Sequence, residues 1–268
     1  MKFRFTGKSP AEMPFLDHLE ELRWRILWSL LAVILCTAVA FVVVMKLDVI
    51  GVLMRPIIPY LDSEKLIYLG VTDPFFITFK LALAMGMVAA SPIVFYQIWS
   101  FLSPALMPGE RRAIVPSLYL GVLLFAGGVA LAYFVALPWT IRFMLGFQTA
   151  SLEPNITAGF YFAFVTKLLL AFGVIFELPV VVLILSALGI VTSGFLRSKR
   201  RYAFAGMAVL SAMITPGDAI TATVVMMGPL LLLYELSIAL ARLVERGRAR
   251  AAAESAAESA TEAVPEPS

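Results

Sequence analysis

The sequence predicts an all-α integral membrane protein, and two observations lead to this prediction. The chain of 268 residues is 61% hydrophobic and 15% charged, with a mean hydropathy of +0.92, whereas soluble domains contain about 45–50% apolar residues. Several apolar stretches also reach about 20 residues, the length of helix that crosses a hydrocarbon core of about 30 Å. The single cysteine, Cys36, provides no disulfide framework.

Six segments are expected to span the membrane. Four of them are long: 24–45, 75–98, 115–138 and 162–185. The fifth, 202–214, lies between the basic run RSKRR and the turn sequence TPGD, which leaves roughly 20 Å of helix. The sixth, 219–240, contains Pro229 and Glu235, so its apolar length is also reduced. Residues 1–242 are therefore predicted to form one membrane domain whose last two helices are short.

Positive charges are distributed unequally between the two ends of these spans. Six spans place both termini on one side, which carries 15 of the 21 Lys and Arg residues, against five on the other side and Lys167 inside a span. The positive-inside rule makes the side with 15 charges cytoplasmic. We therefore expect a multi-pass protein of the cytoplasmic (inner) membrane with both termini in the cytoplasm.

The segments outside the spans differ in composition. The loops 46–74 and 139–161 contain Pro and apolar residues and are expected to form a structured cap on the non-cytoplasmic side. The tail, 243–268, is rich in Ala and Glu without large apolar residues, so we expect it to be disordered or a frayed helix. The basic N-terminus is followed by acidic, amphipathic sequence and is not expected to be a cleaved signal peptide.

The sequence contains few residues of the types that usually carry catalysis. It has one histidine, His18, and one cysteine, and no metal-ligand cluster with usable spacing. The fragment TGKS at 6–9 is similar to part of a phosphate-binding loop, but the first glycine of that motif would fall on Lys2 and no strand precedes it. A net charge of +3 is too small to indicate a nucleic-acid partner. We therefore expect no catalysis, cofactor, metal or nucleic acid.

The segment MPFLDHLEELRWRI precedes the first span and has helical periodicity. Its apolar residues form one stripe: Phe15, Leu19, Leu22 and Ile26. Pairs between Glu21 and Arg25 and between Glu20 and Arg23 would each stabilise the helix by about 0.2–0.5 kcal/mol. Taken alone, these residues predict an interfacial helix with His18 on its polar face.

The loop after the second span reads SPIVFYQIWSFLSPALMPGERR. Its aromatic residues suit a membrane interface: Phe95, Tyr96, Trp99 and Phe101. Glu110 lies beside Arg111 and Arg112, an arrangement that an ordinary solvated charge cluster would also explain.

Glu177 is a carboxylate far inside an apolar span. A charge at the middle of a span costs about 2.5–3.5 kcal/mol, so its side chain is expected to face a cavity or a partner. Pro179 deprives the carbonyl of Ile175 of its helical donor, and we therefore expect a kink beside the carboxylate. A purely structural polar anchor between helices is the alternative interpretation. Lys167, ten residues earlier, is a poor partner within the same helix.

Together these residues resemble the TatC family, the multispanning subunit of the twin-arginine protein translocase. The motifs that carry the resemblance are HLEELRWR at 18–25, SPIVFYQIWSFLSPAL with GERR at 91–112, AFGVIFELP at 171–179 and TPGD at 215–218. In order and spacing they cover about residues 14–242. The resemblance implies a concave, cupped bundle of six helices that acts as a receptor for signal peptides with an arginine pair, carried by folded cargo.

The resemblance also implies which residues act. Glu110 would be the main carboxylate for the arginine pair, with Glu21, Arg23, Arg25 and Phe101 completing the cytoplasmic surface. A guanidinium fork suits a carboxylate because it donates two parallel hydrogen bonds. Glu177 would contact the inserting signal or keep the concave face hydrated at a second stage. Pro179, Pro216 and Asp218 would set kinks and turns.

The partners implied by the resemblance are single-span subunits of the TatA and TatB type, membrane lipids, and further copies of the chain. The short fifth and sixth helices would form the edge that binds the single-span subunits. Thr215 matches a polar position there, whereas Ala222 replaces a glutamine common in the family, so that Thr221 or Thr223 would supply the polar contact. The proton-motive force would drive export.

Two other functions remain open from the residues themselves. In a small-solute or proton-coupled transporter, Glu177 would carry the proton and Lys167 would be its counter-charge. The chain shows no internal repeats of the kind found in many transporters, and a transporter does not need the cytoplasmic Glu and aromatic residues. In a purely structural membrane scaffold, Glu110 and Glu177 would be replaceable without loss of export.

Overall fold

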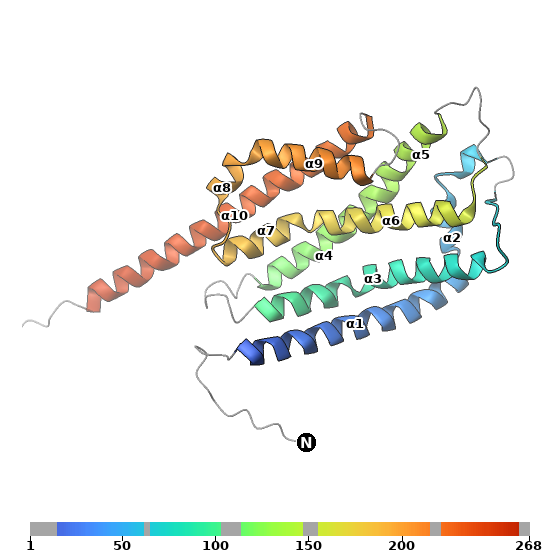
Figure 1. Ribbon diagram of the computed structural model, residues 1–268. Helices are drawn as coiled ribbons and strands as arrows, with labels where there is room; N and C mark the ends of the chain where they lie inside the picture. Colours follow the sequence, from blue (N-terminus) through green and yellow to red (C-terminus); the bar gives the residue numbers. More distant parts are fainter. Residues whose placement is uncertain (1–14, 62–64, 103–113, 147–154, 215–220, 263–268) are drawn as a thin grey trace, which may run out of the picture.

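The computed structural model describes residues 15–61, 65–102, 114–146, 155–214 and 221–262, and most of these residues are helical (Figure 1). The long helices are α1 (Phe15–Lys46), α3 (Asp73–Leu102), α4 (Ile114–Leu131), α6 (Ala158–Phe176) and α10 (Thr221–Glu262). The shorter helices are α2 (Val49–Met54), α5 (Leu137–Leu145), α7 (Leu178–Ala187), α8 (Ser193–Ser198) and α9 (Arg200–Ile214). A 3₁₀ turn, η1 (Ile58–Tyr60), follows α2, and a π-helical segment, η4 (Ala132–Ala136), joins α4 to α5. The predicted all-α class is confirmed.

Five helical segments in the described part of the chain are long and apolar enough to cross a membrane. They are His18–Lys46, Asp73–Leu102, Pro116–Leu145, Ala158–Ala187 and Met227–Ala249. The expected fifth span corresponds to α9, whose 15 residues give about 22 Å of helix, less than the hydrocarbon core of about 30 Å. The prediction of a short helix is therefore confirmed for α9.

The last helix differs from the prediction. α10 has 42 residues and continues through Pro229. It also continues past 242, so residues 243–262 are helical, which agrees with the second of the two alternatives expected for the tail, disorder or a frayed helix. Ala, Glu and Arg are strong helix formers, which explains why this segment adopts a helix without large apolar residues.

Polar contacts hold α10 against α8 beyond the expected domain boundary. The Glu245 carboxylate accepts hydrogen bonds from the backbone N–H and the hydroxyl of Ser193, at 2.7 and 2.5 Å. Within the predicted domain, the Tyr234 hydroxyl of α10 donates to the carbonyl of Leu196 of α8 at 2.7 Å. The packed part of the chain thus extends beyond 242, at least as far as Glu245.

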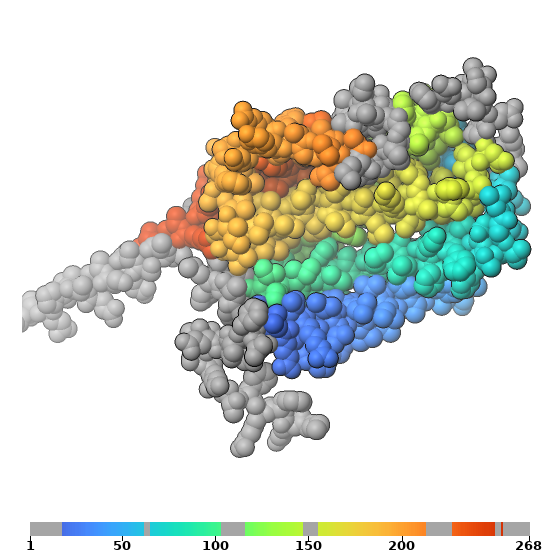
Figure 2. All heavy atoms as spheres, viewed as in Figure 1, coloured from blue at the N-terminus to red at the C-terminus, as the bar shows by residue number. Residues whose placement is uncertain are grey.

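The helices pack as neighbours in an order that is partly that of the sequence (Figures 1 and 2). α1 lies along α3, α3 contacts α4 and α6, α4 lies against α6, and α10 contacts α7 and α9. The approach of α1 to α3 depends on Gly86, because a Cβ atom there would lie 2.6 Å from backbone atoms of Thr37. Small residues commonly allow such close approach between membrane helices.

The largest hydrophobic cluster has buried members from α1, α3, η4, α5, α6, α9 and α10 and from the segment between α2 and η1. Its most buried members are at most 2% exposed: Ile57, Leu81, Ala82, Ala132, Ala136, Leu137, Val165 and Leu168. A second cluster surrounds Trp99 near the end of α3 and includes Val180, Leu183 and Ala187 of α7. Trp99 is only 2% exposed, so its side chain packs within the bundle near the end of α3.

A structured cap covers one end of the bundle, as the composition of the loops predicted. Ile57, between α2 and η1, is buried in the main cluster. The hydroxyls of Tyr133 and Tyr161 donate to the carbonyls of Val52 and Leu53, at 2.6 and 2.7 Å. A β-bridge between Ile67 and Thr157 joins the two loops to each other. The cap is therefore tied to both η4 and α6.

Candidate functional site

The N-terminal part of α1 and the C-terminal part of α3 meet at the end of the bundle opposite the cap. Glu21 and Arg25 of α1 form the predicted ion pair, in which Arg25 Nε donates to Glu21 Oε1 at 3.0 Å. Arg25 also reaches across to α3, where its Nη1 donates to Gln97 Oε1 at 3.4 Å. Arg25 therefore joins the two helices and holds the Glu21 carboxylate in place.

An aromatic contact closes the same end. The rings of His18 and Phe101 are stacked, with centroids 4.4 Å apart and planes at 18°. His18 was expected only to occupy the polar face of α1, whereas the structure places it against α3. The structure thus brings five residues together in what we call the α1–α3 cluster: His18, Glu21, Arg25, Gln97 and Phe101. Three of these were expected to bind a signal peptide, namely Glu21, Arg25 and Phe101.

Two other residues were expected on this surface, Arg23 and Glu110. Arg23 is exposed, and no ion pair joins it to Glu20 although both residues are described. The expected Glu20–Arg23 pair is therefore wrong, because the two side chains remain solvent-facing. Glu110 lies outside the described residues, eight positions after the end of α3.

Glu177 lies at the junction between α6 and α7 and is 9% exposed. The expected kink is present here, since α6 ends at Phe176 and α7 begins at Leu178. The carbonyl of Glu177 accepts from the N–H groups of Val180 and Val181, at 3.0 and 2.9 Å. Pro179 occupies the first turn of α7 and is buried. Although the helix is interrupted at Glu177, the backbone carbonyl and N–H of this residue therefore keep hydrogen-bond partners.

The side chain of Glu177 points into a niche formed by α4 and α3. A Cβ on Gly121 of α4 would lie 3.2 Å from Glu177 Oε2, and 3.7 Å from the ring of Phe95 of α3. Glu177 Oε1 is buried and has no hydrogen-bond donor among the described residues. A buried acceptor without a donor is unfavourable, so this carboxylate is poised to accept a hydrogen bond from an incoming group or water.

The transporter interpretation required a counter-charge for Glu177. Lys167 is exposed on α6, and the described residues contain no ion pair between it and Glu177. This agrees with the expectation that Lys167, ten residues away on one helix, is a poor partner.

The remaining predicted positions lie near the start of α10. Thr221 and Thr223 are in its first turn, and their side chains are not among those described. Thr215, Pro216 and Asp218 lie outside the described residues.

Sequence reasoning missed two residues that shape the candidate site. Gln97 is the partner of Arg25 on α3, and the only signal for it was its place among the aromatic residues of the second span. Gly121 leaves room for the Glu177 carboxylate, and nothing in the sequence of α4 distinguishes it from Gly127 or Gly128. Both depend on which helix faces pack together.

The fold and these groups define a multi-spanning helical membrane protein with a polar cluster at one end and a buried carboxylate within the bundle. The sequence profile of the family described as "Sec-independent protein translocase protein (TatC)" matches residues 17–229. The chain belongs to this family. The predicted family and the prediction that the chain is not an enzyme are therefore confirmed.

Individual relatives agree over nearly their full lengths. The TatC protein of Aquifex aeolicus (strain VF5) is 39% identical over 236 residues, covering 87% of this chain and 97% of the relative. The TatCy protein of Bacillus subtilis (strain 168) is 34% identical, covering 90% of this chain and 93% of the relative. A crystal structure described as the twin arginine translocase receptor TatC superposes with a TM-score of 0.71 at 39% identity, covering 85% of this chain and 99% of the other.

Proposed function

We propose that this chain is the signal-peptide receptor and core subunit of a twin-arginine translocase. It binds the arginine pair of signal peptides on folded cargo at the α1–α3 cluster and at Glu110. It assembles with further copies of itself and with single-span TatA and TatB type subunits, and export is driven by the proton-motive force. It resides in the cytoplasmic membrane with both termini in the cytoplasm.

One observation carries this proposal most directly, the position of Glu21 at the end of the bundle. Arg25 donates hydrogen bonds both to the Glu21 carboxylate and to the side-chain oxygen of Gln97 on α3. His18 lies three residues before Glu21 on α1 and stacks on Phe101 of α3. A guanidinium can bind such a surface through carboxylate contacts and by stacking on an aromatic face. An ammonium supplies neither the planar fork nor the stacking surface.

Glu177 fits a second stage of the same function. Its niche lies within the span Ala158–Ala187, apart from the α1–α3 cluster at the end of the bundle. A signal peptide that is first held by its arginine pair would meet this carboxylate only on moving deeper between the helices. We therefore assign Glu177 to insertion and not to initial recognition.

Peptide binding to the purified full-length chain in nanodiscs tests this function. A labelled signal peptide with an arginine pair is compared with its twin-lysine variant, for the native chain and for Glu110→Gln and Glu21→Gln. Loss of one charge-assisted contact should weaken the arginine peptide about tenfold. Glu20→Gln is the matched control, because Glu20 is exposed on the same helix and forms no ion pair among the described residues.

The outcomes separate the candidate functions. Preference for arginine that is reduced in Glu110→Gln and Glu21→Gln, but kept in Glu20→Gln, supports the receptor. Equal binding of both peptides, or no binding, contradicts it. Raising the salt concentration should weaken the native interaction, because contacts at an exposed end of the bundle are screened.

A further inference from the structure

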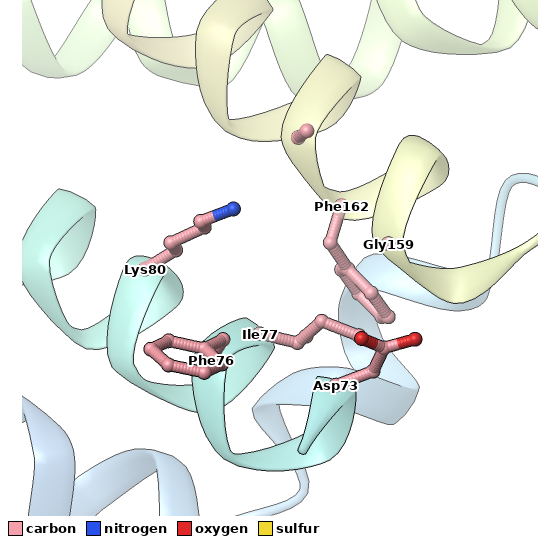
Figure 3. A pocket seen from close by; sticks show the side chains of 7 residues that line it. Asp73, Phe76, Ile77, Lys80, Gly159 and Phe162 are labelled. Atoms are coloured by element: carbon pink, nitrogen blue, oxygen red, sulfur yellow. The ribbon is translucent and has the colours of Figure 1, made fainter. Parts of the chain in front are cut away.

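A small pocket opens between α3 and α6 near the cap, at the opposite end from the α1–α3 cluster. Its volume is about 60 Å³. Figure 3 shows its lining, which combines two charged residues with an apolar wall: Asp73, Phe76, Ile77, Lys80, Gly159, Phe162 and Ala163. Gly159 and Ala163 create the space, because larger side chains at these positions of α6 would fill it. None of the residues assigned above to signal-peptide binding lines this pocket.

Lys80 is the unusual residue of the pocket. It follows Asp73 by seven residues, so it lies about 10 Å further along the helix axis, inside the span Asp73–Leu102. It forms no ion pair with any carboxylate that the structure describes. A lysine within a span is costly unless it reaches water, a headgroup or a counter-charge. An anionic group from outside the chain would therefore be favoured here.

Asp73 does not serve as this counter-charge. Its Oδ2 accepts hydrogen bonds from the N–H groups of Leu69 and Gly70, at 3.1 and 2.8 Å, which hold the carboxylate at the start of α3. In Figure 3 the carboxylate lies beside Phe162, apart from the Lys80 amine on the next turns of the helix. The pocket thus has a fixed negative group near the membrane surface and a positive group deeper in.

A second lysine, Lys167, lies on α6 beyond the residues of this helix that line the pocket. Gly159 and Ala163 line the pocket, and Lys167 follows Ala163 by four residues, which places it on the same helical face. Lys167 is exposed, like Lys80. Beside the pocket, α3 presents three exposed rings, Phe75, Phe76 and Phe79. These rings lie on the surface of a membrane span, where acyl chains of lipids would contact them.

We propose that this pocket binds the headgroup of an aminophospholipid from the leaflet at the cap end. The order of charges matches such a lipid, because its phosphate is nearer the acyl chains and its ammonium extends outward. The phosphate would pair with Lys80, the primary ammonium would donate hydrogen bonds to Asp73, and an acyl chain would lie against the phenylalanines. A trimethylammonium headgroup cannot donate those hydrogen bonds, and a glycerol headgroup brings no positive charge to Asp73.

Lipid retention by the full-length protein tests the proposal. The protein is purified with equal amounts of phosphatidylethanolamine, phosphatidylglycerol and phosphatidylcholine of the same acyl chains, and bound lipid is measured by native mass spectrometry. Phosphatidylethanolamine should be retained preferentially, and Lys80→Gln should lower its retention about tenfold, the effect of one lost charge-assisted contact. Lys46→Gln is the matched control, since Lys46 is an exposed lysine at the same end of the bundle and lines no described pocket.

Two further measurements make the result decisive. Asp73→Asn should reduce phosphatidylethanolamine to the level of phosphatidylcholine, and thermal unfolding shows whether that variant remains folded. If it does not fold, the Lys80→Gln result alone decides. Equal retention of the three lipids, preference for phosphatidylglycerol, or equal losses in Lys80→Gln and Lys46→Gln would overturn the proposal. Displacement of the lipid by millimolar inorganic phosphate would overturn it as well, since it would identify a free-phosphate site.

Discussion

A methyl group added to Gly121 would lie only 3.2 Å from Oε2 of Glu177. The carboxylate on the α6–α7 junction therefore occupies space that α4 leaves free by having no side chain at this position. Its other oxygen, Oε1, is buried without a donor among the described residues. The niche thus fits closely around one oxygen of the carboxylate, while the described residues provide no donor for the other.

Replacing Gly121 by Ala should disturb this niche. A contact of 3.2 Å forces the Glu177 side chain to move, which should cost about 1–3 kcal/mol when the surroundings are tightly packed. Gly127→Ala is the control on the same helix, since nothing lies within 4 Å of an added Cβ there, and helix propensity should make it more stable by about 0.5–1 kcal/mol. Thermal unfolding in detergent should therefore order the two variants with Gly127→Ala higher. The reverse order would show that Glu177 does not fill this space.

Replacing Glu177 by Ala should separate recognition from insertion. Because the α1–α3 cluster remains intact, binding of the arginine-pair peptide should stay within about twofold of the native value, while export of a folded cargo should fall at least about tenfold, as for a lost buried polar contact. Export is measured in membrane vesicles and insertion by crosslinking from the peptide. Glu177→Gln shows whether the charge or only the polar group is needed. Normal export by Glu177→Ala would exclude the assigned role.

The sequence was sufficient to predict the helical class, the short α9 and the kink at Pro179, because hydrophobic length and proline chemistry act locally. It also predicted the Glu21–Arg25 pair, which needs only a spacing of four residues. The contacts of Arg25 with Gln97 and of His18 with Phe101 could not be predicted, since they depend on how α1 lies along α3. The full length of α10 was not predicted, because the tail after 242 lacks large apolar residues and its composition was equally compatible with disorder.

Tyr161→Phe should weaken the attachment of the cap. The Tyr161 hydroxyl donates to the carbonyl of Leu53 at 2.7 Å, and its side chain belongs to the main buried cluster. Removing the hydroxyl leaves that carbonyl without this donor and should cost about 1–2 kcal/mol. Tyr119→Phe is the control, because Tyr119 is 73% exposed and should change stability by less than about 0.5 kcal/mol. Equal thermal unfolding of the two variants would show that this hydrogen bond does not stabilise the cap.

Arg25→Lys should weaken both the contact between α1 and α3 and peptide recognition. The native guanidinium donates to Glu21 and Gln97 at the same time, whereas an ammonium lacks the planar fork that serves two acceptors in fixed directions. Stability should fall by about 1 kcal/mol, and the affinity for the arginine-pair peptide should fall severalfold because Glu21 is no longer held. Arg23→Lys is the matched control for stability, since Arg23 is exposed. Thermal unfolding and peptide titration of both variants test this.

If the two substitutions lowered stability equally, Arg25 would not be the residue that joins the helices. If Arg25→Lys lowered stability but left peptide affinity unchanged, the α1–α3 cluster would be a structural contact, and recognition would have to depend on other residues.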